Sequence, residues 1–343
     1  MQNDIKNVAI LGLGSWGMAI ALVLNDNKCN INIWDVNSKR IKILDKTKKF
    51  DLLDWIKIPK QIKLLDDMKE TIQNSDLIIF AVPSNAIRDV AEKLKKVALN
   101  NKINLNRKVF LSVAKGIEYE TYNYMTDIIG ETLNIKSKNL FALSGPSHAE
   151  EVSKKIPTTV CISGENKTIL KKLQKTFSNN YFRVYITNDL KGLELGGAAK
   201  NIIAIAAGIV DSIGLGDNTK AALITRGLLE IARLGKKLGT KTETFYGLSG
   251  LGDLIVTCIS RHSRNRYFGE QLGKGKTTKK ILSEMNMVAE GVLATKSIYN
   301  LAKKHKVEMP IVTEIYNVIY KNKSPKTSVI NLMQRELKEE KFL

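Results

Sequence analysis

The stretch Val8-Ala-Ile-Leu-Gly12-Leu-Gly14-Ser-Trp-Gly17 decides the fold of the first part of this chain. Its apolar residues predict a short buried strand, and its glycines predict a tight turn that leads into a helix. The first glycine allows the turn, the second lets the backbone approach a pyrophosphate, and the third lets the helix pack close to the strand. Because amides at a helix start favour phosphate groups, the stretch predicts a dinucleotide-binding loop.

An acidic residue beyond this loop bears on the choice of cofactor. Asp35 ends the next predicted strand, about twenty residues after Gly12, where a carboxylate commonly accepts hydrogen bonds from a ribose 2′-hydroxyl. The same carboxylate repels a 2′-phosphate, so Asp35 predicts a preference for NAD(H). Asn37, Lys39 and Arg40 follow closely and would relieve part of this repulsion, which leaves NADP(H) as the alternative cofactor.

Length and composition indicate a two-domain protein with a substantial core. The chain has 343 residues, of which 43% are hydrophobic. No stretch approaches the roughly 20 unbroken apolar residues of a membrane span, and the N-terminus lacks a signal-peptide pattern. Cys29, Cys161 and Cys258 lie far apart without a CxxC pair, which is typical of reduced thiols. We therefore expect a cytoplasmic protein without a transmembrane segment.

A formal net charge of +20 raises the question of a nucleic-acid partner. The lysines are spread along the whole chain, without an arginine-rich arm or a basic strip interleaved with aromatic residues. We therefore expect no nucleic acid as the main partner, and a lysine-rich surface that helps to attract an anionic substrate. The chain has only 3 histidines, which argues against a zinc site, and we expect no metal.

The order of predicted elements indicates two domains of different class. The first part alternates strands and helices, which predicts an α/β domain with a mainly parallel sheet over residues 1–188. After about residue 188, strand patterns nearly vanish and helical patterns take over, which predicts an all-α domain over residues 189–343. The predicted strands are 8–11, 31–34, 77–82, 109–113, 140–143, 158–162 and 182–186; the predicted helices are 84–97, 168–177, 190–213, 218–238, 292–304 and 313–320.

A single lysine in the second domain is the strongest catalytic candidate. Lys200 follows Gly-Gly-Ala-Ala and precedes a run of Ile and Ala at helical spacing. Burying a cation among apolar residues costs free energy unless the charge is paired. Reduced solvation also lowers the pKa of a lysine toward the range useful for proton transfer. The alternative is a lysine whose stem extends from the helix to solvent. The small residues before it favour a functional role, because they let a cofactor and a substrate approach.

Two further residues are candidates for the same chemistry. Lys115 follows the strand at 109–113 and precedes Gly116, which places it at a strand end where ligands bind in open α/β sheets; the alternative is an ordinary loop lysine. Asp253 closes the glycine-rich segment 247–253, which we interpret as a loop. It would orient Lys200 or accept from a ligand hydroxyl, or it would cap a helix at 254–259.

A cluster of cations predicts a phosphate site. The guanidinium of Arg264 would bind two phosphate oxygens, and the amide of Asn265 would add a third donor. Arg261 and Arg266 could do the same, and the residue types alone do not choose among the three arginines. His262 is interpreted as a loop histidine.

Seven blocks together resemble the bacterial type of NAD(P)-dependent sn-glycerol-3-phosphate dehydrogenase. The resemblance covers about residues 7–335, and its blocks occur in the order of that family. They are Gly12-Leu-Gly-Ser-Trp-Gly17, Ala81-Val-Pro-Ser84, Ala114-Lys-Gly-Ile-Glu118, Ser144-Gly-Pro-Ser-His-Ala-Glu-Glu-Val152, Gly196-Gly-Ala-Ala-Lys-Asn201, Gly247-Leu-Ser-Gly-Leu-Gly-Asp253 and His262-Ser-Arg-Asn265.

The resemblance implies a Rossmann domain followed by a helical domain, usually in a homodimer, that reversibly reduces dihydroxyacetone phosphate to sn-glycerol 3-phosphate for phospholipid synthesis. It implies Lys200 as the proton acceptor; the residues themselves add Lys115 and Asp253 to the expected catalytic set. The implied cofactor contacts, beyond Gly12, Gly14, Gly17 and Asp35, are Ser15, Trp16, Lys115, Ala149, Arg264, Val288 and Glu290. The implied substrate contacts are Lys115, Gly145, Ser147, Lys200, Asp253, Ser263, Arg264 and Asn265. Many relatives carry a non-acidic residue where this chain has Asp35.

Two other functions compete with this one. One is a different two-domain dehydrogenase, of the 6-phosphogluconate or 3-hydroxyacyl-CoA kind; the scarcity of histidines argues against a histidine-dependent mechanism. The other is a non-catalytic nicotinamide sensor that uses its positive charge on nucleic acid or a membrane surface.

Overall fold

The computed structural model describes residues 5–285 and 289–340. Contacts between residues divide the chain into two units. The first unit consists of Met1–Ala114 and Met125–Leu190, and the second consists of Lys115–Tyr124 and Lys191–Leu343. The segment Lys115–Tyr124 therefore packs with the second unit although it interrupts the first unit along the sequence, an excursion that the sequence analysis did not anticipate.

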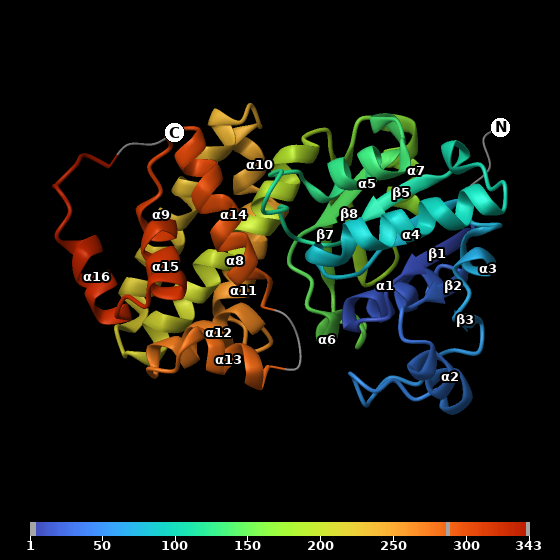
Figure 1. The fold of residues 1–343 in the computed structure, drawn as a ribbon, viewed down its shortest axis with the longest axis horizontal. Helices are drawn as coiled ribbons and strands as arrows, with labels where there is room; N and C mark the ends of the chain where they lie inside the picture. Colours follow the sequence, from blue (N-terminus) through green and yellow to red (C-terminus); the bar gives the residue numbers. More distant parts are fainter. Residues whose placement is uncertain (1–4, 286–288, 341–343) are drawn as a thin grey trace. The chain divides into compact units, whose positions relative to one another are not determined.

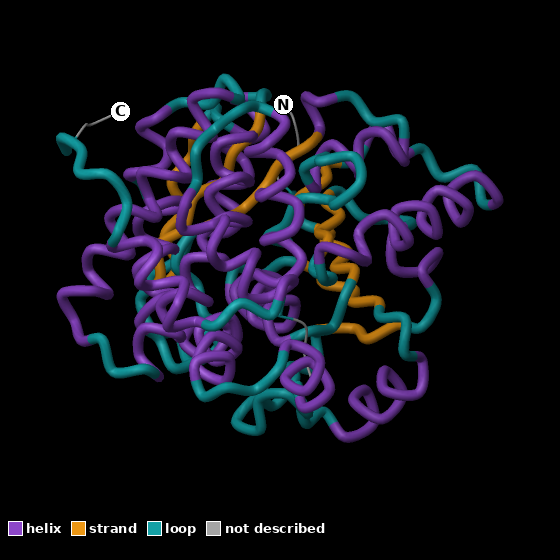
Figure 2. Tube along the Cα trace, turned by 60° about the vertical axis from the view of Figure 1, so that its left-hand side comes forward, coloured by secondary structure: helices purple, strands orange, loops and turns teal. Residues whose placement is uncertain are grey.

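The first unit is built on one eight-stranded sheet with the order β3-β2-β1-β4-β5-β6-β7-β8. All neighbouring strands are parallel except β6 and β7, which are antiparallel. The strands are drawn as arrows in Figure 1 and in orange in Figure 2. Their bounds are β1 Asn7–Leu11, β2 Asn30–Trp34, β3 Ile62–Leu65, β4 Leu77–Phe80, β5 Val109–Ser112, β6 Leu140–Ser144, β7 Thr158–Gly164 and β8 Phe182–Thr187. The mainly parallel α/β domain expected from the sequence is confirmed.

The sequence pattern does not predict β3, for a physical reason. This strand has only four residues and lies at the edge of the sheet, where it pairs with β2 alone. A lysine inside it, Lys63, breaks the continuous apolar pattern that marks the central strands.

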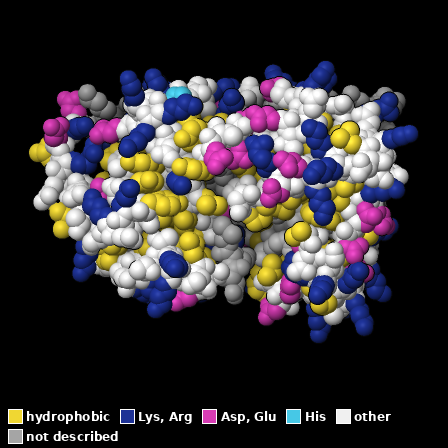
Figure 3. Space-filling view, viewed as in Figure 1, with side chains coloured by type: hydrophobic (Ala, Val, Ile, Leu, Met, Phe, Trp, Pro, Cys, Tyr) yellow, Lys and Arg dark blue, Asp and Glu magenta, His cyan; other side chains and the backbone are white. Residues whose placement is uncertain are grey.

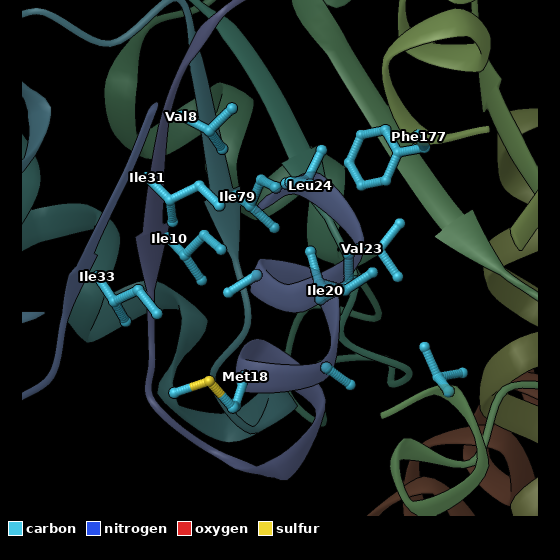
Figure 4. Close-up of a cluster of buried hydrophobic side chains, with 14 of the residues drawn as sticks. Val8, Ile10, Met18, Ile20, Val23, Leu24, Ile31, Ile33, Ile79 and Phe177 are labelled. Atoms are coloured by element: carbon cyan, nitrogen blue, oxygen red, sulfur yellow. The ribbon is translucent and has the colours of Figure 1, made fainter. Parts of the chain in front are cut away.

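Alternate side chains of the strands point to opposite faces of the sheet and build two cores. Val8 and Ile10 of β1 pack against Met18 and Val23 of helix α1 in one core, which also includes Phe177 of α7 (Figure 4). The other face carries α3, α4 and α5. The helices of this unit are α1 Ser15–Asp26, α2 Ser38–Thr47, α3 Met68–Ile72, η1 Ser84–Ala86, α4 Ile87–Asn100, η2 Leu105–Arg107, α5 Met125–Leu133, η3 Ser137–Asn139, α6 Ala149–Val152 and α7 Lys167–Phe177.

The named secondary-structure elements in the described part of the second unit are all helices, as the sequence predicts, and the unit is organised around α8. That helix, Leu190–Ser212, is long and apolar enough to cross a membrane by length and composition, yet its apolar window is completely buried within the structure. Small residues let its neighbours approach: a Cβ at Gly196 would lie 2.9 Å from the Ser249 carbonyl oxygen. The other helices are α9 Gly216–Lys237, α10 Thr242–Tyr246, η4 Leu248–Gly252, α11 Asp253–Ile259, α12 Arg264–Gly273, α13 Thr278–Glu284, α14 Glu290–Lys304, α15 Pro310–Lys321 and α16 Pro325–Met333.

Basic side chains do not form a single patch on the face shown in Figure 3. Lys and Arg are scattered there among uncharged and acidic side chains. This distribution is typical of a lysine-rich solvated surface, and it differs from the concentrated basic stripe of a nucleic-acid-binding face.

Candidate active site

The glycine-rich turn of the first unit has the geometry of a phosphate-binding loop. Gly12 has φ +113°, in the region that favours glycine, and a Cβ there would lie 2.6 Å from the Ala81 carbonyl oxygen. Gly14 is the N-cap of α1 and provides no side chain to satisfy the first amides of that helix, those of Ser15 and Trp16 among them. No atom would lie within 4 Å of a Cβ at Gly14. The loop therefore fits the pyrophosphate of a dinucleotide.

Asp35 lies beside this loop and helps to hold it. Its Oδ2 accepts a hydrogen bond from Leu13 N at 2.8 Å, and its Oδ1 accepts one from Asn37 N at 3.0 Å. Each carboxylate oxygen has a second lone pair, so Asp35 can still accept from ribose hydroxyls. Arg40 reaches the same turn from α2, where its Nη1 donates to the Leu13 carbonyl oxygen at 2.8 Å.

A second turn of the first unit follows β6. Gly145 has φ +138°, and a Cβ there would lie 3.0 Å from Val160 Cα, so a side chain is excluded. The Ser147 hydroxyl donates to the Gly145 carbonyl oxygen at 2.8 Å. Ala149 is the first residue of the short helix α6. These three sequence-predicted residues therefore share one compact turn.

In the second unit, Lys200 and Lys115 share one carboxylate. The Nζ of Lys200, in the middle of α8, donates to Asp253 Oδ1 and, at 2.7 Å, to Thr257 Oγ1. The Nζ of Lys115 donates to Asp253 Oδ2 at 2.6 Å. Lys200 is only 5% exposed and Asp253 only 1%, so both side chains are almost completely removed from water. The alternative of a lysine that extends to solvent is therefore wrong.

Burial and charge set the protonation of this cluster. Burial lowers the pKa of Lys200 to about 8; Lys115 lowers it as well, while Asp253 opposes the shift. Burial alone would raise the pKa of Asp253, but the charges of Lys115 and Lys200 hold it below its ordinary value. The arrangement keeps a carboxylate ionised beside a lysine that can lose its proton close to neutral pH.

The glycine-rich segment before Asp253 is helical, and its interpretation as a loop was wrong. Residues of η4 form a π-helical turn that leads directly into α11. A Cβ at Gly250 would meet the backbone of Phe245, so the glycines serve close packing here. The N-cap of α11 is Gly252, and no side chain caps it. Asp253 is thus not a helix cap, and its side chain is directed to the two lysines.

Thr257 is a member of this cluster that the sequence analysis missed. Its Oγ1 accepts from Lys200 and donates to the Asp253 carbonyl oxygen at 2.6 Å. A helix beginning at Asp253 places residue 257 one turn later, on the same face. The spacing of four residues was therefore an available signal.

The start of α12 carries the predicted phosphate-binding residues. Ser263 is its N-cap and accepts from Arg266 N at 3.2 Å, while Arg264, the first residue of the helix, is exposed. Arg266 is engaged in ion pairs with Asp211 and Glu270, at 2.8 and 2.7 Å. The guanidinium of Arg266 is therefore engaged within the second unit, and Arg261 is exposed outside the helix.

The side chain of Asn265 is buried and links two other segments of the second unit by hydrogen bonds. Its Nδ2 donates to Asn201 Oδ1 at 2.9 Å, and its Oδ1 accepts from Gly291 N at 2.9 Å. Asn265 therefore connects the residue after Lys200 to the first turn of α14, where Glu290 is the first residue. Of the remaining predicted cofactor contacts, Val288 lies outside the described residues.

Within residues 5–285 and 289–340, no group of three or more His, Cys, Asp and Glu side chains is arranged to hold a metal ion.

Both parts of the chain match models of a known protein family. The model of the NAD-dependent glycerol-3-phosphate dehydrogenase N-terminus matches residues 7–170, and that of the C-terminus matches residues 189–330. A glycerol-3-phosphate dehydrogenase (NAD(P)+) of Fusobacterium nucleatum is 48% identical, with 97% of this chain and 98% of that protein covered. The corresponding protein of a Thermoanaerobacter species is 46% identical, with coverage of 97% and 98%.

Solved structures agree with these matches. The crystal structure of glycerol-3-phosphate dehydrogenase from Coxiella burnetii has a TM-score of 0.90 and 34% identity, and the match covers 96% of this chain and 99% of that one. Identities of this size over nearly the full length, together with both domain models, show that the chain belongs to the family of NAD(P)-dependent glycerol-3-phosphate dehydrogenases.

Proposed function

We propose that this enzyme catalyses reversible hydride transfer between NAD(P)H and dihydroxyacetone phosphate, and that the sn-glycerol 3-phosphate formed feeds glycerophospholipid synthesis. The observation that carries the proposal is the buried cluster of Lys200, Asp253 and Lys115. A family relationship alone would not supply a group that can gain and lose a proton at physiological pH, whereas this cluster does.

Each member of the cluster has a distinct part in this proposal. A bound nicotinamide supplies the hydride. During reduction, Lys200 gives a proton to the carbonyl oxygen as negative charge develops there, and in the reverse direction the neutral amine takes the hydroxyl proton. Asp253 orients both amines because each of its oxygens accepts from one of them. Lys115 donates a hydrogen bond to the same substrate oxygen and lowers the pKa of Lys200 by its charge.

The start of α12 provides the phosphate site of the proposal. The exposed guanidinium of Arg264 stands at the first position of a 10-residue helix, where backbone amides and the helix dipole also favour an anion. Ser263 and Asn265 complete this site, with the buried amide of Asn265 fixing the turn. Gly145 and Ser147 are proposed substrate contacts as well.

The remaining assignments concern the cofactor and the assembly. Gly12, Gly14, Ser15, Trp16 and Gly17 bind the dinucleotide in this proposal. Asp35 favours NAD(H) because its carboxylate lies beside the turn. The other proposed cofactor contacts are Lys115, Ala149, Arg264, Val288 and Glu290.

We further propose residues 1–188 as the dinucleotide-binding domain and residues 189–343 as the substrate domain. A homodimer in the cytoplasm completes the proposal, and light scattering after gel filtration measures the oligomeric state.

The direct test follows NADH absorbance in the presence of dihydroxyacetone phosphate. Reduction by the wild-type enzyme, and its loss in Lys200→Ala with NADH binding retained, is the expected result. Absence of turnover in the wild type with either NADH or NADPH would contradict the proposed reaction. A Lys200→Ala variant that turns over at the wild-type rate would contradict the role of this lysine.

A further inference from the structure

Arg40 lies between two carboxylates next to the dinucleotide-binding turn. Its Nη1 donates to the carbonyl oxygen of Leu13, and the amide of the same residue donates to Asp35. Its Nε and Nη2 donate to the two carboxylate oxygens of Asp51, both at 2.7 Å. Leu13 therefore contacts both side chains, the guanidinium of Arg40 through its carbonyl oxygen and the carboxylate of Asp35 through its amide.

The contacts of Arg40 leave part of its binding capacity unused. A guanidinium has five N–H donors, and contacts with Leu13 and Asp51 account for three of them. A guanidinium with free donors beside the position of the ribose 2′-oxygen is the chemistry that recognises a 2′-phosphate. However, Asp51 neutralises this cation, and Asp35 adds a second negative charge close by.

The pair of Arg40 and Asp51 is held by the fold. Asp51 follows Phe50, whose side chain is buried and lies under the guanidinium, 5.7 Å from ring centroid to Cζ. The backbone of Phe50 is fixed in turn, since its amide donates to the Ile56 carbonyl oxygen at 3.1 Å. The position of Asp51 is thus determined by a core residue, and the bidentate geometry makes the pair stronger than a single surface contact.

We propose that Asp51 is a specificity-determining residue that disfavours a 2′-phosphate by occupying and neutralising Arg40. The inference rests on the proposed function in that it takes the turn at Gly12 to bind NAD(P). Asp35 provides selection for the 2′-hydroxyl through its own charge; Asp51 acts at a distance from the ribose, through the arginine.

The test replaces Asp51 and measures binding without turnover. In Asp51→Asn and Asp51→Ser, NADPH and the fragment 2′,5′-ADP should bind roughly three- to tenfold more tightly, the size expected from an uncompensated charge near a surface. NADH and 5′-AMP should change by less than about twofold, because they carry no 2′-phosphate. Nucleotide fluorescence and calorimetry measure these affinities. The gain should disappear when Arg40→Met is combined with Asp51→Asn.

A matched control separates this effect from charge in general. Asp45→Asn removes one negative charge from α2, the helix that carries Arg40. Asp45 pairs with Lys48 and does not contact Arg40. This control should leave the affinities for NADPH, 2′,5′-ADP, NADH and 5′-AMP unchanged. The proposal is overturned by an equal gain in Asp45→Asn, by a gain that persists without Arg40, by unchanged NADPH affinity, or by parallel weakening of NADH and NADPH.

These outcomes are distinct from failure of the proposed function. An enzyme that binds both nucleotides but never reduces dihydroxyacetone phosphate would refute the proposed reaction while the binding comparison remains decisive. Thermal unfolding of each variant confirms that the comparison is made between folded proteins.

Discussion

Lys200 and Asp253 are 53 residues apart in sequence and form a buried ion pair in the second unit. The lysine belongs to the middle of α8, and the aspartate begins α11. A buried pair of this kind contributes little to stability by itself, because desolvation offsets most of the attraction between the charges. Its position on two neighbouring helices is consistent with a chemical role, and the following predictions test that role.

Replacement of Lys200 by Ala should reduce kcat for reduction of dihydroxyacetone phosphate by roughly 10²–10⁴-fold, the usual contribution of a positioned acid or base. The affinity for NADH should stay within about twofold, since Lys200 is assigned to the substrate and not to the nucleotide. Stopped-flow single turnovers and NADH fluorescence titration measure the two effects. A matching loss of NADH affinity would assign Lys200 to cofactor binding instead.

Oxidation of sn-glycerol 3-phosphate should depend on pH through Lys200. Its pKa, lowered by burial to about 8, means that the neutral amine becomes the major form only above that pH. The value of kcat/KM for oxidation should therefore rise with pH and level off above about 8, whereas reduction, which needs the ammonium, should decline there. Steady-state rates over a pH series test this, and a flat profile in both directions would contradict it.

Removal of the positive charge at Lys115 should move this profile. Because Lys115 lowers the pKa of Lys200, Lys115→Met should raise that pKa and shift the oxidation profile to higher pH by roughly one pH unit. The exposed Lys96 on α4 provides a matched control, and Lys96→Met should leave the profile in place. A shift to lower pH in Lys115→Met would show that the electrostatic assignment has the wrong sign.

Arg264 should carry most of the phosphate affinity. Arg264→Ala should raise KM for dihydroxyacetone phosphate by roughly 30–100-fold, as expected for the loss of a charge-assisted hydrogen-bonding group. Arg261→Ala, which removes the same charge three residues earlier, should change KM by less than about threefold. Equal effects of both changes would favour a diffuse electrostatic contribution over a defined clamp.

Stability should depend on pH through Glu230, a buried residue whose carboxylate accepts from Ile311 N at 2.8 Å and Val312 N at 3.3 Å. Burial raises its pKa from 4.5 to about 7, so the folded state holds a proton that the unfolded state has lost between these values. The contribution of Glu230 protonation to the stability of the folded state is fully present below pH 4.5 and is lost as the pH rises through about 7.

The stability of the wild type relative to Glu230→Gln should therefore be greater at pH 5 than at pH 8. Thermal or urea unfolding at the two pH values measures this difference. Glu92→Gln, an exposed change on α4, should show a constant difference from the wild type at both. A wild type whose advantage grows with pH would contradict the assignment.

Local sequence accounts for the parts of the site that lie within one turn. The residues from Val8 to Gly17 predict their own strand, turn and helix, because the apolar run marks the strand and glycine is required in the turn at a positive φ and where a Cβ would strike backbone. The small residues before Lys200 likewise indicate a buried helix around a cation. By contrast, the segment before Asp253 was predicted as a loop, because glycine marks both flexible turns and close helix packing, and only the neighbour Phe245 distinguishes them.

The sequence by itself determined the class of each domain, the nucleotide-binding turn and the family, since these depend on periodicity and on short motifs. Only the tertiary structure decided that Lys115 packs with the second unit, that one carboxylate accepts from two lysines, and that Arg266 is paired with Asp211. These facts depend on contacts between residues far apart in the chain. The pKa of Lys200 belongs to the same group, because burial sets it, and burial is a property of the whole packed unit.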